Sequence, residues 1–259
     1  MGGVTRRAFG AVVLALGACA SGPPEGLRTL APGTLRIGTY FVNPPFEYVS
    51  NGERLGFEVD LMNEIARRLA LTPVFVDTQW ETILQQMQAG QYDAIVGGIT
   101  ITPQREKSLA WSTPYMTSTL SIVVDSRRSP QIRGVADLRA ASVGVQAATT
   151  DYDVAVRMQQ KGQIGSVKVY SFDRIQDAMV DLAAGRITAV MKVYPVAAWL
   201  ARQTPDLSIV AQVPDDPQPL GIGFARNNPG LLAAVNRALA DMQRDGSYAR
   251  LAQKWGVPQ

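Results

Sequence analysis

The chain has 259 residues, of which 25 are basic and 22 acidic, and its formal net charge is +3. It contains no histidine and one cysteine, which excludes chemistry that relies on imidazole and excludes a disulfide within the chain. No basic run with interleaved aromatic residues occurs, so nucleic acid is not an expected partner, and we expect neither a metal site nor a cofactor.

The N-terminus has the order of an export signal. Arg6 and Arg7 precede an apolar stretch, residues 8–18, that is too short to span a bilayer as a helix. The two arginines resemble a twin-arginine export motif, and a signal for the general secretory route is the alternative. Removing both leaves 23 basic and 22 acidic side chains, a net charge of +1, so the basic character belongs partly to the signal.

Cys19 follows this apolar stretch. Residues 16–19 read Leu-Gly-Ala-Cys and resemble a bacterial lipobox, in which the cysteine is diacylated and becomes the mature N-terminus. We therefore expect residues 1–19 to be a lipoprotein signal peptide and residues 20–33 a flexible tether. The protein would then be exported and held by its lipid at the membrane of the cell envelope. An incidental thiol that is lost with an ordinary signal peptide is the alternative.

Strand and helix patterns alternate after the tether. Strands are expected over residues 35–40, 73–77 and 92–98, and amphipathic helices over residues 57–69 and 81–89. An alternation of this kind predicts a parallel α/β sheet flanked by helices.

The alternation then repeats along the chain. Strands are expected over residues 121–124, 142–146, 167–170 and 188–191. A short helix is expected to begin at residues 137–138, and a longer one, capped by Thr150 or Asp151, to end at Gln160. Two further helices are expected, over residues 175–184 and from Pro195 onwards. A last strand over residues 220–225 and a helix over residues 230–244 remain, and they would return to the first sheet. Two similar α/β units without a polar linker predict two lobes.

This organisation places a discontinuous first lobe at residues 34–117 and 219–259. The second lobe covers residues 118–218. Two strands, near residues 116–120 and 216–221, would link the lobes and act as a hinge.

Four motifs carry a resemblance to a known family. They read PFEY at residues 45–48, GFEVDL at residues 56–61, GGITITPQR at residues 97–105, and DGSY followed by KW at residues 245–255. In this order and spacing they resemble the bacterial extracellular solute-binding proteins of family 3, of the polar amino-acid-binding type. The resemblance implies a type II periplasmic-binding-protein fold: two lobes, each a mainly parallel sheet flanked by helices, with a two-strand hinge.

The resemblance also implies a function. Proteins of this family are monomeric receptors that capture an amino acid or a related small carboxylate by hinge closure and deliver it to the permease of an ABC importer. Two alternatives stay open at this point. The first is a ligand-sensing subunit for a membrane receptor. The second is a dehydratase of the same fold, which would use a carboxylic acid of the second lobe as proton donor. Val196 occupies the position of that acid in this chain, which argues against the second alternative.

The family pattern assigns ligand contacts to residues of this chain. Trp80 matches an aromatic residue that stacks on the ligand, and Arg105 matches an arginine that holds its α-carboxylate through paired hydrogen bonds. The other matching positions are Gly98 and Thr100, at the end of the third strand, and Thr149 and Thr150, at a helix N-terminus. Each has a structural alternative, since arginines are usually solvated, tryptophans usually pack in cores and threonines often cap helices.

Three positions depart from the family pattern. Val193 stands where an aspartate usually pairs with the ligand ammonium, Tyr40 where an acid is common, and Asn43 where an aromatic residue is frequent. An ammonium taken out of water without a partner costs several kcal/mol. We therefore expect a ligand that keeps a carboxylate but lacks a strongly charged α-amine, or one that binds in another pose. Basic amino acids are the least favoured ligands.

Overall fold

The structure is a computed structural model that describes residues 27–214 and 216–258. The predicted signal peptide, Cys19 and residues 20–26 lie outside the described residues. Residues 27–33, predicted as the end of the tether, contact the body of the protein: the Leu30 amide donates to Asp93 Oδ1 at 2.7 Å, and Asn228 Nδ2 donates to the Arg28 carbonyl at 2.9 Å. Within the described part of the chain, no helix combines the length and the apolar character needed to cross a membrane.

The first sheet has five strands. Their spatial order is β5 (Thr72–Asp77), β1 (Thr34–Thr39), β6 (Ala94–Ile95), β15 (Gly223–Phe224) and β7 (Ala110–Trp111). The pairing is parallel from β5 to β6, and only β15 runs against the others. The strand β15 comes from the C-terminal part of the chain, as predicted, so the chain returns to the first sheet.

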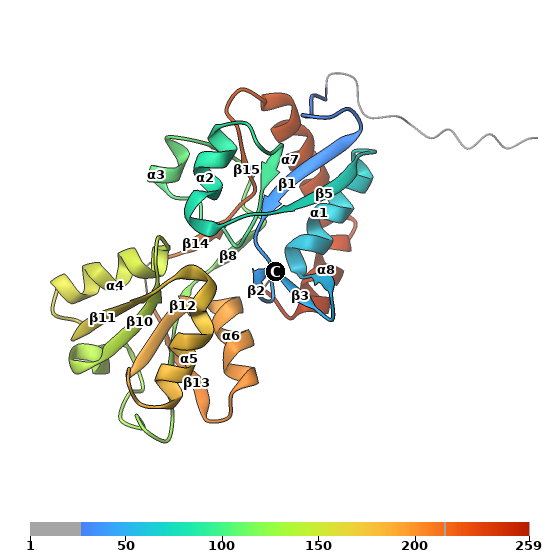
Figure 1. Cartoon of the computed structure of the whole chain (residues 1–259). Helices are drawn as coiled ribbons and strands as arrows, with labels where there is room; N and C mark the ends of the chain where they lie inside the picture. Colours follow the sequence, from blue (N-terminus) through green and yellow to red (C-terminus); the bar gives the residue numbers. More distant parts are fainter. Residues whose placement is uncertain (1–26, 215, 259) are drawn as a thin grey trace, which may run out of the picture.

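Five helices accompany this sheet, and we call the whole unit the first lobe (Figure 1). They are α1 (Phe57–Arg68), α2 (Trp80–Gln88), α3 (Pro103–Glu106), α7 (Pro229–Arg244) and α8 (Ser247–Trp255). Helix α1 packs against α7, α8 and β5, while α2 lies against β1 and β6. A small antiparallel sheet beside α1 contains β2 (Val42–Asn43), β3 (Glu47–Ser50) and β4 (Glu53–Leu55).

The second lobe is built on a sheet of the same type. Its strands have the order β11 (Ser166–Tyr170), β10 (Ser142–Gln146), β12 (Ala189–Val193), β9 (Leu120–Asp125) and β13 (Leu207–Gln212), and only β9 runs against the others. The helices are α4 (Thr150–Gln160), α5 (Ile175–Ala183) and α6 (Tyr194–Gln203), with short 3-10 turns η1 (Val135–Ala140) and η2 (Phe172–Arg174). Four of five strands in each sheet therefore share one direction, and the predicted two-lobed α/β fold is confirmed.

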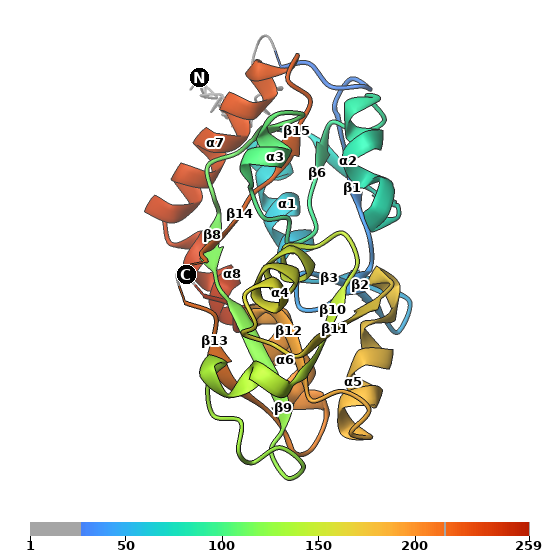
Figure 2. The ribbon, with the colours of Figure 1, turned by 90° about the vertical axis from the view of Figure 1, so that its left-hand side faces the viewer.

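Two strands connect the lobes, as Figures 1 and 2 show. β8 (Met116–Ser118) pairs antiparallel with β14 (Gln218–Leu220), and each continues directly towards the second lobe. This is the pair of linking strands that the sequence predicts.

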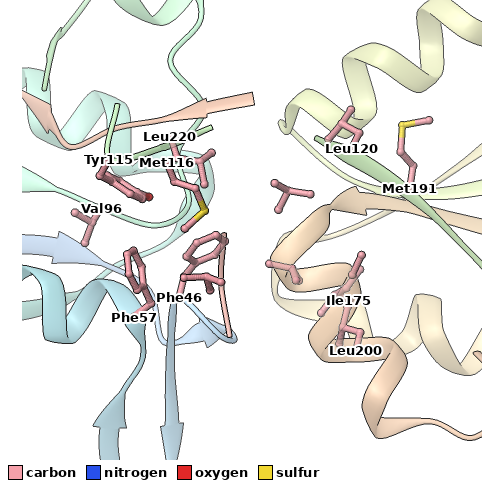
Figure 3. Packing of buried hydrophobic residues seen from close by; sticks show 14 of the residues in the cluster. Phe46, Phe57, Val96, Tyr115, Met116, Leu120, Ile175, Met191, Leu200 and Leu220 are labelled. Carbon is pink, nitrogen blue, oxygen red and sulfur yellow. The ribbon is translucent and has the colours of Figure 1, made fainter. Parts of the chain in front are cut away.

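Both lobes contribute buried hydrophobic side chains to one cluster, part of which is shown in Figure 3. In the first lobe Phe46 and Phe57 are fully buried, and in the second Met191 is fully buried and Leu200 nearly so. Helix α1 supplies its apolar face at the positions that the 3.6-residue repeat predicts, with Leu61, Met62 and Ile65 at 0% exposure.

Several predicted elements differ from those observed. The third strand is confined to Ala94–Ile95, because Gly97 and Gly98 adopt φ angles of 155° and 59° that no strand contains. The helix at residues 137–138 is a 3-10 turn. The N-cap of α4 is Thr149, not Thr150 or Asp151: its hydroxyl accepts a hydrogen bond from the Tyr152 amide at 3.3 Å.

Candidate functional site

One cavity lies between the two lobes, with a volume of about 20 Å³. The first lobe lines it with Tyr40, Asn43, Trp80, Gly97, Gly98, Thr100 and Arg105, and the second with Thr149, Thr150, Asp151, Phe172, Lys192 and Val193. All nine residues predicted from the sequence to contact a ligand are in this set, although that role itself stays a prediction. Four lining residues were not predicted from the sequence: Gly97, Asp151, Phe172 and Lys192.

Arg105 enters the cavity from the short helix α3. Thr102 caps that helix, accepting from the Arg105 amide at 3.2 Å, and the guanidinium donates from Nη1 to the Thr100 carbonyl at 2.9 Å. A longer contact of 3.5 Å joins Nη2 to the Ala148 carbonyl in the second lobe. Its Cζ atom lies 5.2 Å from the centre of the Trp80 ring. The guanidinium is therefore positioned by carbonyls and an aromatic face.

No residue that the structure describes forms an ion pair with Arg105. Burial lowers the pKa of its guanidinium, and the negative charge of Asp153 acts in the opposite direction. A guanidinium stays protonated despite such a shift, since its ordinary pKa is above 12. Arg105 thus brings to the cavity a positive charge that has no ion-pair partner among the described residues, and a carboxylate would be bound strongly there.

Three aromatic rings form one wall of the cavity. Trp80 of the first lobe stacks on Phe172 of the second, with ring centres 4.9 Å apart and planes inclined by 21°. The Tyr40 ring meets both edge-on, at 5.6 Å from Trp80 and 4.7 Å from Phe172. Trp80 Nε1 also donates to the Ala148 carbonyl at 3.2 Å. The wall therefore joins the two lobes.

The wall beside Gly97 is tightly packed. The Tyr40 hydroxyl donates to the Gly97 carbonyl, and a Cβ at Gly97 would lie 2.6 Å from the Tyr40 ring. Asn43 Nδ2 donates to Glu47 Oε1 at 3.0 Å. The Tyr40 hydroxyl proton and Asn43 Nδ2 thus have partners within the first lobe, which limits what these donors can offer to a ligand.

Two buried carboxyl groups stand behind this wall. Both oxygens of Glu58 accept from the Gly98 amide at 3.0 Å, and Glu58 also accepts from the Tyr115 hydroxyl. Burial raises the pKa of Glu47 well above its usual value, and the neighbouring Glu58 raises it further. Glu58 therefore fixes the backbone that turns at the glycine pair.

The threonines of both lobes meet across the cleft. Thr100 Oγ1 lies 3.5 Å from Thr150 Oγ1 and donates to Gln218 Oε1, on the linking strand β14, at 3.1 Å. Thr149 donates to the Gln146 carbonyl at 2.7 Å and caps α4. Its hydroxyl thus serves the backbone of the second lobe, while the N-terminus of α4 faces the cavity through Thr150.

A buried ion pair lies in the second lobe at the edge of the cavity. Lys192 Nζ is 3.2 Å from Asp151 Oδ2, and the two side chains are 5% and 3% exposed. Lys192 Nζ also lies 5.5 Å from the centre of the Phe172 ring. Val193, which stands where the family pattern has an aspartate, ends β12 and is the N-cap residue of α6. The sequence carried a signal for this pair, because Lys192 is the charged residue of an otherwise apolar strand.

A wider groove lies on the other side of the aromatic wall. Its volume is about 640 Å³, and Tyr40, Trp80 and Phe172 line both spaces. Its rim carries three acids, namely Asp77, Glu81 and Asp173. Among the residues described, no group of three or more acidic or sulfur-bearing side chains is placed to hold a metal ion.

The chain matches a family model over residues 35–258, and the model is that of the "Bacterial extracellular solute-binding proteins, family 3". Among curated proteins, the "L-cystine-binding protein TcyJ" of Escherichia coli (strain K12) is 31% identical over 234 residues, covering 89% of this chain and 86% of the relative.

Two solved structures are similar over most of the chain. "An ancestral arginine-binding protein bound to arginine" has a TM-score of 0.78 and 32% identity, covering 86% of this chain and 98% of the other. "The ancestral amino acid-binding protein AncCDT-1, a precursor of cyclohexadienyl dehydratase" has a TM-score of 0.76 and 34% identity, covering 86% and 95%.

Proposed function

Because the chain belongs to family 3 of the bacterial extracellular solute-binding proteins, we propose that it is the receptor of an ABC importer. Its ligand is an amino acid or a related small carboxylate, bound in the cavity between the two lobes. The relatives support this class, since one is named for cystine and another was solved with arginine.

The observation that carries the proposal is the Arg105 guanidinium. It lines a cavity made by both lobes and has no carboxylate partner among the described residues. A guanidinium holds a carboxylate through two parallel hydrogen bonds, and water is largely excluded here. The first turn of α4, at Thr150, adds N–H groups and the positive end of a helix dipole on the opposite side.

Binding requires the lobes to separate and close again. A cavity of about 20 Å³ has room for about one water molecule, so an amino acid cannot enter without movement of the walls. The linking strands β8 and β14 provide the hinge. A ligand that contacts Arg105 on one lobe and α4 on the other binds the closed form better, and it shifts the equilibrium towards that form.

The remaining features of the receptor are proposals from the sequence. The lobes divide at residues 34–117 with 219–259 and at residues 118–218. The protein is a monomer, exported and anchored through a lipid on Cys19.

We also propose that the protein binds its ligand without transforming it. Val196, the position where the acid of a dehydratase would be sought, is 1% exposed and packs within α6, outside the set of residues that line the cavity. The one carboxyl group in that set, Asp151, is engaged by Lys192. Incubation of the mature protein with prephenate should therefore yield no dehydrated product by chromatography, and turnover would contradict this part of the proposal.

A thermal-shift screen of refolded, ligand-stripped mature protein tests the receptor function. The panel contains free amino acids, their α-keto and N-acyl counterparts, and dicarboxylates. A ligand at a hundredfold its dissociation constant adds about 2.7 kcal/mol to stability, or about 5–10 °C for a domain of this size.

Arg105→Ala is the variant for this screen, with Arg105→Lys beside it. Removing one partner of a buried charge pair costs about 2–5 kcal/mol of binding, so the alanine variant should lose the shift. Lysine should restore only part of it, because it cannot form the paired bonds. An unchanged shift in Arg105→Ala would refute the proposed site, and no shift with any carboxylate would refute the function.

A further inference from the structure

Each lobe supplies one cation to the cavity, and the second-lobe cation is buried. Arg105 comes from the first lobe and Lys192 from the second, and the resemblance to the family points only to the first of them. Lys192 Nζ has three N–H bonds, of which one has a partner among the described residues, Asp151 Oδ2 at 3.2 Å. Arg105 has five N–H donors and uses two of them on carbonyls. Both cations therefore keep donors for a ligand.

The charges that line the cavity are not balanced. Arg105 and Lys192 are positive, and Asp151 is the one acid among the lining residues. Other acids lie outside the lining residues: Glu58, behind the first-lobe wall, accepts hydrogen bonds from the Gly98 amide and the Tyr115 hydroxyl, and the charge of Asp153 acts on Arg105. Burial raises the pKa of Glu47, the second carboxyl group behind that wall. Because two cations and one acid line the cavity, a ligand of net negative charge would neutralise the charge of the lining, where water screens little.

We propose that the ligand carries two acidic groups, as an acidic amino acid or a small dicarboxylate does, with one group on Arg105 and the other on Lys192. This inference rests on the proposed function and narrows its ligand class. The two groups would connect a cation of one lobe to a cation of the other, so the same contacts that select the ligand also stabilise the closed form.

Asp151 gives the ammonium of an acidic amino acid a partner. It lies at the second position of α4 and faces the cavity. Val193, on β12, lacks the carboxylate that the family pattern places at that position. Asp151, on α4, would supply a carboxylate for the ligand ammonium instead. A ligand ammonium and Lys192 can share the two oxygens of Asp151, because Lys192 occupies only Oδ2.

A cationic side chain fits this cavity poorly. It would meet the Lys192 ammonium, and like charges that are buried together repel strongly. The acids Asp77, Glu81 and Asp173 would attract such a side chain, but they lie in the groove beyond the aromatic wall. The ring contacts of Tyr40, Trp80 and Phe172, at centre distances of 4.7–5.6 Å, separate that groove from Arg105.

Isothermal titration of the ligand-stripped mature protein tests the proposal. The probes are L-glutamate, L-aspartate and succinate, their neutral counterparts L-glutamine and L-asparagine, and L-arginine. We expect the best diacid to bind at least about tenfold tighter than its neutral counterpart, as a buried pair of opposite charges predicts.

Lys192→Met should abolish this preference. Because that change leaves Asp151 buried without a partner, the double variant Asp151→Asn/Lys192→Met accompanies it and keeps the site neutral. Lys168→Met is the matched control, since Lys168 also pairs with an acid of the second lobe, Asp181, but lies away from the cavity with a side chain 47% exposed. The control should retain the full preference, and Lys192→Arg should retain most of it.

The possible results distinguish the two-acid ligand from the receptor function on which that proposal rests. Tightest binding of L-glutamine, L-asparagine or L-arginine would overturn the two-acid proposal and leave the receptor function standing. A diacid preference that survives in both Lys192→Met variants would also overturn it. If no probe and no other carboxylate binds the wild-type protein, the receptor function fails as well.

Discussion

At the scale of single residues, the charged groups near the cavity differ in their surroundings. Arg105 lines the cavity and has no ion-pair partner among the described residues, whereas Glu47 and Glu58 are buried in the wall behind it. The surroundings of Arg105 favour an added anion. Glu58 holds the turn at Gly97 and Gly98 in place through the Gly98 amide.

Glu47→Gln should change how stability depends on pH. Burial raises the pKa of Glu47 above the unfolded value of 4.5, so the folded state keeps the neutral form. Below about pH 4.5 both states are protonated and no penalty exists. As the pH rises through this value towards the folded pKa, the unfolded chain ionises first and the wild type loses stability, by at most about 1.4 kcal/mol per pH unit. Glutamine stays neutral throughout.

Thermal melts between pH 4 and pH 8 measure this difference. The stability of Glu47→Gln relative to the wild type should increase with pH. Glu53→Gln, at an exposed position in the same small sheet, is the control for removing a carboxylate. A constant difference between Glu47→Gln and the wild type across this range would contradict the assignment of a neutral Glu47 to the folded state.

At the scale of elements, helix α1 is positioned by the residue before it. Gly56 has a φ of 141° and links the small sheet to α1, and a Cβ there would lie 2.0 Å from the Phe46 carbonyl oxygen. That carbonyl accepts from the Glu58 amide at 2.9 Å, in the first turn of α1. The motif GFEVDL therefore begins with a glycine because both its backbone angle and its surroundings exclude a side chain.

Gly56→Ala should accordingly destabilise the protein strongly. The strained φ and the contact with backbone atoms predict a loss of at least about 3 kcal/mol, or about 6–12 °C in Tm. Gly134→Ala is the matched control, since nothing lies within 4 Å of its added Cβ and its φ of −165° suits any residue. Its Tm should change by no more than about 2 °C. Equal melting temperatures for the two variants would contradict this account.

At the scale of the whole molecule, the two lobes are held together by contacts that cross the cleft. Those close to the cavity include the Trp80–Phe172 stack, the Trp80 contact with the Ala148 carbonyl and the approach of Thr100 to Thr150. They connect segments that are far apart in the sequence. If the proposed hinge opens, these contacts break, so we expect the balance between open and closed forms to depend on single aromatic side chains.

Phe172→Ala should shift this balance towards the open form. An aromatic pair contributes about 0.5–1.5 kcal/mol, so the ratio of open to closed molecules should rise by about two- to twelvefold. Small-angle X-ray scattering without ligand should then give a larger radius of gyration. Phe75→Ala is the control, because Phe75 pairs with Phe41 inside the first lobe at 6.3 Å. Equal radii for Phe172→Ala and the wild type would argue against closure through the stack.

The sequence by itself determined the order of elements, the two lobes, the linking strands and nine of the residues around the cavity. The elements depend on local repeats of 2 and 3.6 residues. The nine residues follow from the resemblance to the family, whose motifs they match. Short elements, such as the small sheet within residues 42–55, were not predicted. Its strands have two to four residues, too few to show the two-residue alternation that marks a strand.

Only the tertiary structure decided how the charges of the cavity are arranged. Asp151 and Lys192 are separated by some forty residues, and Phe172 meets Trp80 from the other lobe. No local repeat encodes such pairs, because they depend on strand order and on closure of the cleft. The expectation of a ligand without a charged amine depended chiefly on Val193. The structure places Asp151 and Lys192 beside Val193 in the cavity lining, because the first turn of α4 and the last residues of β12 line the same cavity.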